Sequence, residues 1–165
     1  MDLVQDIARI ALQEERLQFL SFDATTAWAI GTRLREVAAG RNAVVAIDIQ
    51  LHGHPLFFAA MPGTTPNNVD WIRRKRNVVQ RFHRSSYAVG LELQQGQKTL
   101  ADTIGVELRD YATHGGCFPI NLRGTGCVGT ITVSGLPQRD DHALVVEVLA
   151  EFLGQPLEEL ALDAA

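Results

Sequence analysis

The chain has 165 residues, of which 46% are hydrophobic and 21% charged, a composition typical of one soluble globular domain and unlike that of disordered or fibrous proteins. The formal net charge of -4 argues against general affinity for nucleic acid or anionic membranes, and no apolar run approaches the roughly 18 to 20 residues of a membrane-spanning helix. The acidic, amphipathic N-terminus does not resemble a secretory signal, so we expect a cytoplasmic protein.

The first part of the chain predicts two helices and a β-hairpin. The elements are a helix over residues 2–16, a short strand or lead-in over 18–22, a helix from the N-cap Asp23 to Gly40, and strands over 43–51 and 56–61. The first helix follows from Leu3, Ile7 and Ile10, which recur at helical spacing. The strands are apolar runs, and His52-Gly53-His54-Pro55 between them predicts a slightly long hairpin turn.

Further helices and a second hairpin are predicted in the rest of the chain. They are a helix from the cap Thr65 to about His83, a helix from Ser85 or Ser86 toward Gln95, a broken helix and loop over 97–113, a hairpin over 115–133 and a long helix over 138–153. Because the strands come in hairpins and not in alternating βαβ units, this order predicts an α+β fold, with helices packed on an antiparallel sheet. We expect one domain over residues 1–165, with a core at about 3–154 and an acidic tail at 155–165.

The third predicted helix carries an unusual density of positive charge. Residues 71–84 hold six of the 15 Lys and Arg residues and no acid. Adjacent helix residues point about 100° apart, so the six cannot all serve one ligand. Three interpretations stay open: a solvated basic face, a local nucleic-acid contact, or Lys75 or Arg76 reaching into a pocket or subunit interface to pair with a carboxylate or phosphate.

The C-terminal stretch is an acidic counterpart to that helix. From residue 138 onward the only basic residue is Arg139, whereas the acids are Asp140, Asp141, Glu147, Glu151, Glu158, Glu159 and Asp163. Ion pairs between the two regions, within or between subunits, would account for both without any ligand.

Residues 112–137 are the most informative segment, because glycines punctuate two short strands there. Glycine lets the backbone approach a ligand or a neighbouring strand closely, and the helix that follows offers free N–H groups at its start. His114 precedes two glycines, and Asp141 and His142 lie in the first turn of that helix, so these three are candidate acid, base or ligand-orienting groups. Each also suits a purely structural role, as a hydrogen-bonded histidine or as an acid at a positive helix end.

Several other kinds of site are disfavoured. Cys117 and Cys127 flank the predicted hairpin turn with a spacing unlike that of zinc sites, and we expect reduced, packed thiols, with redox pairing as the alternative. No His or Cys spacing matches a zinc or iron signature, so no metal site is predicted. Gly124-Thr125-Gly126 precedes a strand where a phosphate loop would precede a helix, and Ser134 lies outside any Gly-x-Ser-x-Gly elbow.

Several motifs together resemble a known family. They are His114-Gly115-Gly116 with Phe118-Pro119-Ile120, then Gly129-Thr130-Ile131-Thr132-Val133-Ser134-Gly135-Leu136-Pro137 and Asp141-His142. These are similar to the haem-degrading-domain superfamily of HbpS-like and GlcG-like proteins, over about residues 3–154. Trp71-Ile72-Arg73-Arg74-Lys75-Arg76-Asn77 resembles an uncharacterised branch of that superfamily.

The resemblance implies a profilin-like three-layer sandwich, a central antiparallel sheet flanked by helices, and homo-oligomers built from dimers. Relatives include proteins that bind, sense or degrade haem, members encoded beside glycolate metabolism, and a eukaryotic member linked to the handling of tail-anchored proteins. Haem is therefore a possible cofactor by resemblance, with His114, His142, His83 and the cysteines as candidate ligands by element type.

We therefore expect a cytoplasmic, oligomeric domain that binds a small anionic ligand, such as haem through its propionates, between the end of the last strand and the basic helix. The candidate ligand-binding residues are Trp71, Lys75, Arg76, Asn77, His114, Gly115, Gly116, Ser134, Gly135, Asp141 and His142. One alternative is a haem-degrading or other small-molecule enzyme that uses His114 or His142 as acid or base. A second is a protein-interaction or chaperone-cofactor scaffold without pocket chemistry.

Overall fold

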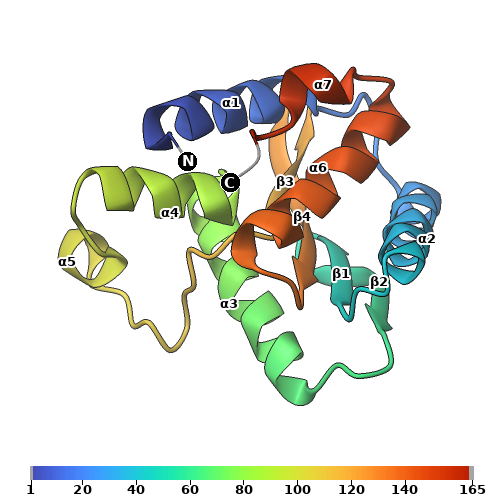
Figure 1. Cartoon of the computed structure of the whole chain (residues 1–165), viewed down its shortest axis with the longest axis horizontal. Helices are drawn as coiled ribbons and strands as arrows, with labels where there is room; N and C mark the ends of the chain where they lie inside the picture. Colours follow the sequence, from blue (N-terminus) through green and yellow to red (C-terminus); the bar gives the residue numbers. More distant parts are fainter. Residues whose placement is uncertain (1, 164–165) are drawn as a thin grey trace.

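A computed structural model describes residues 2–163, which form seven helices and four strands (Figure 1). In chain order these are α1 (Leu3–Arg16), α2 (Ala24–Gly40), β1 (Ala46–Leu51), β2 (His54–Ala60), α3 (Pro66–Phe82), α4 (Ser86–Gln95), α5 (Leu100–Ile104), β3 (Cys117–Leu122), β4 (Gly126–Ser134), α6 (Gln138–Leu153) and α7 (Leu157–Leu160). Within this range no helix has both the length and the apolar character that crossing a membrane requires.

The four strands form one antiparallel sheet in the order β2-β1-β4-β3. Each hairpin therefore supplies one central and one edge strand, and the sheet closes where β1 pairs with β4 in continuous register from Ala46↔Ser134 to Leu51↔Gly129. Helices flank both faces of this sheet (Figure 1). The α+β fold predicted from the element order is confirmed, and so is the flanked antiparallel sheet that the family resemblance implied.

The two faces of the sheet differ in polarity because side chains alternate along each strand. One face is apolar, and its residues, Ile47 and Ile131 among them, share the main core with α2 and α6. The opposite face carries polar residues, including Asp48 and Thr132, which stand side by side on neighbouring strands. Helix α3 packs over this polar face, so charged groups of α3 meet a polar floor.

A second layer of helices covers the β3 side of the molecule. Helix α1 packs on α4 through a small cluster that includes Ile10, Tyr87 and Leu91. Helix α7 lies beside α1 (Figure 1), where the Gln13 side-chain amide donates to the Leu160 carbonyl at 2.7 Å. The predicted acidic tail thus contains a short packed helix, and only its residues 164–165 lie outside the described range.

Two local predictions differ from the structure, and one that was left open is resolved. Residues 18–22, predicted as a short strand or a lead-in, are a lead-in that makes a single parallel bridge between Phe19 and Leu122. Strand β1 begins at Ala46 and not at residue 43. The hairpin turn is shorter than expected, because His52 and Gly53 both have positive φ (49° and 78°), which closes the hairpin with two residues and lets His54 pair with Leu51.

Candidate functional site

A cleft of about 240 Å³ opens where the first turn of α3, the end of β4 and the first turn of α6 meet the loop before β3. It is lined by Asn67, Asn68, Trp71, Lys75, His114, Ser134, Gly135, Leu136, Gln138 and Asp141. The prediction placed a pocket between the last strand and the basic helix, and this cleft occupies that place. Six of the eleven candidate residues line it: Trp71, Lys75, His114, Ser134, Gly135 and Asp141.

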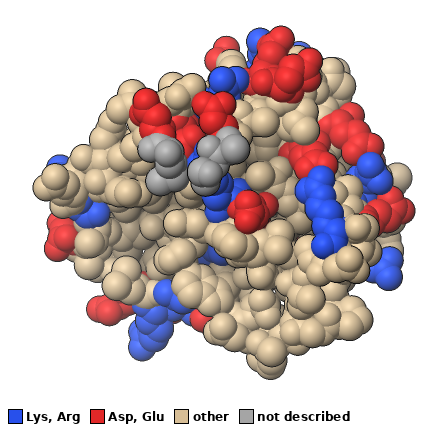
Figure 2. Space-filling view, in the orientation of Figure 1, with Lys and Arg blue, Asp and Glu red and all other residues tan. Residues whose placement is uncertain are grey.

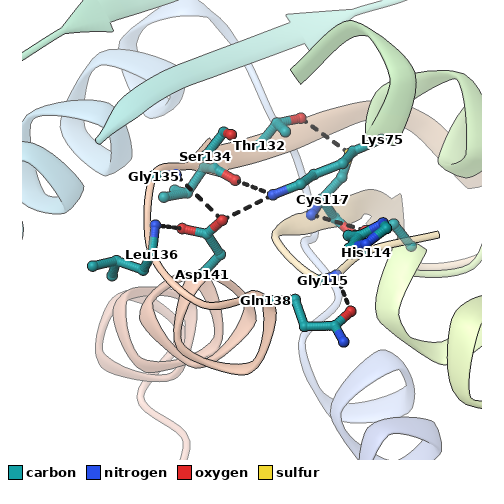
Figure 3. A network of polar contacts seen from close by, with 12 residues as sticks. Lys75, His114, Gly115, Cys117, Thr132, Ser134, Gly135, Leu136, Gln138 and Asp141 are labelled. Carbon is teal, nitrogen blue, oxygen red and sulfur yellow. Dashed lines mark hydrogen bonds and ion pairs between the residues drawn. The ribbon is translucent and has the colours of Figure 1, made fainter. Parts of the chain in front are cut away.

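The floor of the cleft is a buried ion pair. Lys75 Nζ lies 2.8 Å from Asp141 Oδ2 and donates to the Val133 carbonyl at 3.1 Å, and the two charged side chains are only 3% and 2% exposed (Figure 3). Asp141 also accepts the backbone N–H groups of Gly135 and Leu136, at 3.4 and 2.9 Å. Burial raises the pKa of Asp141, and the Lys75 charge and these hydrogen bonds oppose that rise.

His114 and Trp71 form the rim. Their rings meet edge to face with centroids 4.8 Å apart, and the Arg74 guanidinium lies 4.5 Å from the Trp71 ring centroid. The pKa of His114 is lowered, first by partial burial of the ring and then by the positive charges of Lys75 and Arg74. At neutral pH the rim therefore presents an uncharged imidazole, in which one ring nitrogen donates a hydrogen bond and the other accepts one.

Gly115 and Gly116 hold the loop against α6 and β4. A Cβ atom on Gly115 would lie 2.1 Å from the Gln138 carbonyl oxygen, and one on Gly116 would lie 2.4 Å from that of Val133. Gly116 also has φ of +120°, a conformation that side chains disfavour. The glycines thus allow close backbone approach, here to other parts of the chain, and they support the cleft without lining it.

Besides the two glycines, three predicted site residues lie outside the cleft. Arg76 Nη1 pairs with Asp48 Oδ2 at 3.0 Å on another flank of α3, and the Asn77 amide donates to the Asp110 carbonyl at 2.8 Å. His142 is completely buried on the side of α6 that faces α1, where its Nε2 lies 2.8 Å from Gln13 Oε1. The structure therefore does not bring His142 to the same place as Asp141, because neighbouring helix residues point about 100° apart.

The environment of His142 is that of a structural residue. Its ring packs near Tyr87 and Phe118, with centroids 5.2 and 6.0 Å away. Burial, helped by the charge of Arg139 and opposed by that of Asp6, lowers the pKa of His142 to about 3. Its Nδ1 is buried and has no hydrogen-bond partner among the described residues. A neutral ring that donates from Nε2 to Gln13 satisfies this geometry.

The expected attraction between the basic helix and the acidic C-terminal region is realised by one contact among the described residues, Lys75 with Asp141. Glu151 of α6 pairs instead with Arg33 of α2, and Glu147 pairs with Arg41, the residue that follows α2. Figure 2 shows the result on one face, where acidic and basic side chains are interspersed and no basic band forms. Most of these charges are therefore paired within the fold.

Four cleft residues were not predicted: Asn67, Asn68, Leu136 and Gln138. Asn67 and Gln138 belong to the first turns of α3 and α6. The signal for them was present, because Thr65-Pro66 and Pro137 mark helix starts, and first-turn N–H groups have no partner within the helix.

The cysteines do not face each other. Cys117 lies opposite Thr132 and Cys127 opposite Asn121, and both thiols are free. Burial raises the pKa of Cys117 to about 12, and the Thr132 hydroxyl donates to its sulfur at 3.0 Å. Within residues 2–163 no group of three His, Cys, Asp or Glu side chains is arranged to hold a metal ion.

Comparison with known proteins identifies the family. The family model described as "Haem degrading protein HbpS-like" matches residues 22–150. A UPF0303 protein of Azotobacter vinelandii is 64% identical over 163 residues, which are 99% of this chain and 98% of that protein. This chain belongs to the HbpS-like family. A second UPF0303 protein, Rleg2_2653 of Rhizobium leguminosarum bv. trifolii, is 56% identical over the same length and covers 99% of this chain and 98% of its own.

Solved structures agree with that assignment. The crystal structure of Ybr137w protein is 32% identical with a TM-score of 0.83, covering 90% of this chain and 87% of that one. HbpS is 21% identical with a TM-score of 0.63, covering 84% and 94%. A PduOC:heme complex is 19% identical with a TM-score of 0.61, covering 79% and 93%. The last two share the HbpS-like fold, and the resemblance inferred from the sequence motifs is confirmed.

Proposed function

We propose that this HbpS-like chain binds a small anionic ligand in the cleft between α3 and α6. The observation that carries the proposal is that two helix N-termini converge on a buried ammonium group. The first turns of α3 and α6 both line the cleft, and Lys75 lies at its floor. The N-terminus of a helix bears a partial positive charge and unpaired N–H groups, so two of them favour an anion.

The cleft has hydrogen-bond donors that no residue between 2 and 163 uses. Lys75 directs two of its three N–H groups to Val133 and Asp141, which leaves one for a ligand. Asn67 lines the cleft from an exposed position, and within the described part of the chain Gln138 engages only its side-chain oxygen, which accepts from the Gly115 N–H. Because Asp141 already neutralises Lys75, the ligand would be held by hydrogen bonds and helix ends, which suits a compact carboxylate.

Haem meets these conditions only in part. Its propionates have the right charge, and His114 at the rim is of a residue type that can ligate haem iron. The cleft of about 240 Å³, however, is smaller than the roughly 300–1,000 Å³ of pockets that enclose drug-sized ligands. The residues present therefore fit a single carboxylate group and do not fit an enclosed macrocycle in one chain. Because PduOC forms a complex with heme on the same fold, haemin is a necessary arm of the test.

Self-association is the second part of the proposal. Large apolar side chains are exposed on one chain, with Leu20 82% and Trp28 60% accessible. Such surface favours contact with further copies of the chain. We expect a homo-oligomer in the cytoplasm, and sedimentation velocity measures its subunit number.

Trp71 offers a direct experiment. The chain has two tryptophans, so Trp28→Phe leaves Trp71 as the only indole, at the rim of the cleft. Titration of this variant with acetate, oxalate and sulfate should change its fluorescence in a saturable way. Asn67→Leu should weaken binding about fivefold through a lost hydrogen bond, whereas Gln80→Leu, exposed on the same helix outside the cleft, should not.

Two results would refute the anion site: no saturable change with any of these anions, or equal effects of Asn67→Leu and Gln80→Leu. Adding haemin should give no Soret shift that depends on His114, and a shift lost in His114→Gln would replace the small anion with haem. Native mass spectrometry of the freshly purified protein reports any retained ligand and the number of subunits together.

A further inference from the structure

A larger cleft lies between α3 and the β1–β2 hairpin. Helix α3 covers the polar face of the sheet over β3, β4 and β1, which leaves the β2 side open. The opening measures about 760 Å³, within the roughly 300–1,000 Å³ typical of small-molecule sites. It shares no lining residue with the first cleft.

Polar side chains are buried at the bottom of this opening. Asp48 and Gln50, on β1, are 4% and 7% exposed and both line the cleft. Asp48 accepts from the Gln50 amide at 3.1 Å and from Arg76 Nη1 at 3.0 Å. Among the described residues, these are the contacts of the Asp48 carboxylate. The side-chain carbonyl of Gln50 and most of the Arg76 N–H groups therefore stay available to a ligand.

A second observation concerns Thr130, which does not line the cleft and is fully buried beside its floor. Thr130 lies directly opposite Gln50 in the β1–β4 register, so the two side chains share one face of the sheet. Its Oγ1 is buried and has no hydrogen-bond partner among residues 2–163. Buried polar groups are normally paired, so an unsatisfied hydroxyl next to Gln50, whose side chain does line the cleft, indicates that polar groups at this floor lack partners.

The charges that line this cleft balance, with Asp48 and Asp70 against Arg73 and Arg76. The Arg76 guanidinium is matched by Asp48, and Arg73 on the rim is paired with Asp70 and Asp110 at 3.0 Å each. A charged ligand would meet a like charge as closely as an opposite one, and its desolvation would go uncompensated. The floor instead offers a donor beside acceptors, the pattern that an uncharged amide completes.

The walls are apolar. Phe58 on β2 and Val69 on α3 are 51% and 45% exposed, and Ile72 and Ala60 continue the two sides. An aromatic side chain across from an aliphatic one favours a flat apolar body between them. We infer that the larger cleft binds an uncharged planar aromatic molecule that carries an amide group, with the amide on Gln50, Asp48 and Arg76.

Three isosteric probes test this assignment: benzamide, benzoate and benzamidinium, which differ in charge. Benzamide should bind at least about fivefold more tightly than either ion in saturation-transfer NMR titrations of the whole chain. Gln50→Leu should remove about fivefold of that affinity. Ala60→Phe, at an exposed edge-strand position, should fill the cleft and abolish binding, whereas Asn67→Phe, which fills the first cleft, should leave benzamide binding unchanged.

Each contrary result overturns the inference in its own way. Tighter binding of benzoate would make this a second anion site, and sensitivity to Asn67→Phe alone would place benzamide in the first cleft. Failure of all three probes to bind a chain that unfolds cooperatively would remove the site. If Ala60→Phe changes the subunit number in sedimentation velocity, a second copy of the chain fills this face. None of these results bears on the anion site, which the acetate and sulfate titrations test separately.

Discussion

Lys75 and Asp141 join α3 to the first turn of α6 through an ion pair of 2.8 Å that is almost wholly buried. Asp141 also fixes the turn after β4 through the N–H groups of Gly135 and Leu136. One carboxylate thus connects the basic helix, the end of the sheet and the last long helix. The candidate anion site depends on this connection, because the walls of the cleft are the elements that it holds together.

Breaking this pair should destabilise the fold strongly. Lys75→Met leaves the Asp141 carboxylate buried without its cation, at an expected cost of about 3–5 kcal/mol in the free energy of unfolding. Because burial already raises the pKa of Asp141, losing Lys75 should raise it further, so the variant should regain stability relative to wild type as the pH falls and the carboxyl protonates. Urea unfolding at pH 7 and pH 5 measures both effects.

The double variant Lys75→Met, Asp141→Asn is the matched control. It removes both charges and should recover most of the stability at pH 7, since no unpaired ion stays buried. A single variant as stable as wild type would show that the pair contributes little to holding α3 against α6.

The close approach of the 113–116 loop gives a second prediction. Gly116→Ala would place a Cβ atom 2.4 Å from the Val133 carbonyl and 2.8 Å from Lys75 Nζ, at a φ of +120°. We expect a loss of several kcal/mol in the free energy of unfolding, because backbone atoms must move. Gly124→Ala, with φ of +76° and no atom within 4 Å, isolates the backbone strain and should cost about 1 kcal/mol. Equal losses in chemical denaturation would mean that packing at Gly116 is not limiting.

Local patterns in the sequence predicted most of the fold. Helical spacing and caps placed the helix starts well, as at Thr65 before Pro66 and Asp23 before Ala24. Strand β1 shows what was missed: the alternation of Asp48 and Gln50 with isoleucines marked a strand with one polar face, whereas the run was interpreted as simply apolar.

The candidate site was predictable only in part, because side chains separate in three dimensions. Asp141 and His142 are adjacent in sequence, yet one reaches Lys75 and the other Gln13, on different sides of α6. Arg76 finds its partner in Asp48, 28 residues earlier, and no spacing rule connects them. The cleft could be placed between the end of β4 and the basic helix, but which side chains of these elements line it depends on tertiary packing.

The buried His142 should make the protein less stable in mild acid. Its pKa is about 3 in the folded state and about 6.5 in an unfolded chain, so between these values the unfolded state binds more protons. Stability is therefore fully present above pH 6.5 and is lost as the pH falls, by about 2 kcal/mol between pH 7 and pH 5. His142→Gln can still donate to Gln13. This variant should lose that much less free energy of unfolding between pH 7 and pH 5, as measured by urea denaturation. An unchanged slope would assign the acid sensitivity to other groups.

His114 should make anion binding pH-dependent at the first cleft. Its pKa is lowered by partial burial and by the charges of Lys75 and Arg74, so the ring is neutral at pH 7. When the pH falls through that lowered pKa, the imidazolium adds a positive charge beside the anion, and the bound anion in turn favours protonation. At about 4 Å in a watery environment this is worth about 1 kcal/mol, so affinity for sulfate should rise as the pH is lowered from 7 toward 5, by up to about fivefold once the ring is fully protonated. Sulfate is chosen because it stays doubly charged over this range.

Fluorescence titration of the Trp28→Phe variant measures the change in sulfate affinity, with circular dichroism to verify that the protein is folded at each pH. In His114→Gln the affinity should be independent of pH, and an equal rise in that variant would show that another group carries the effect.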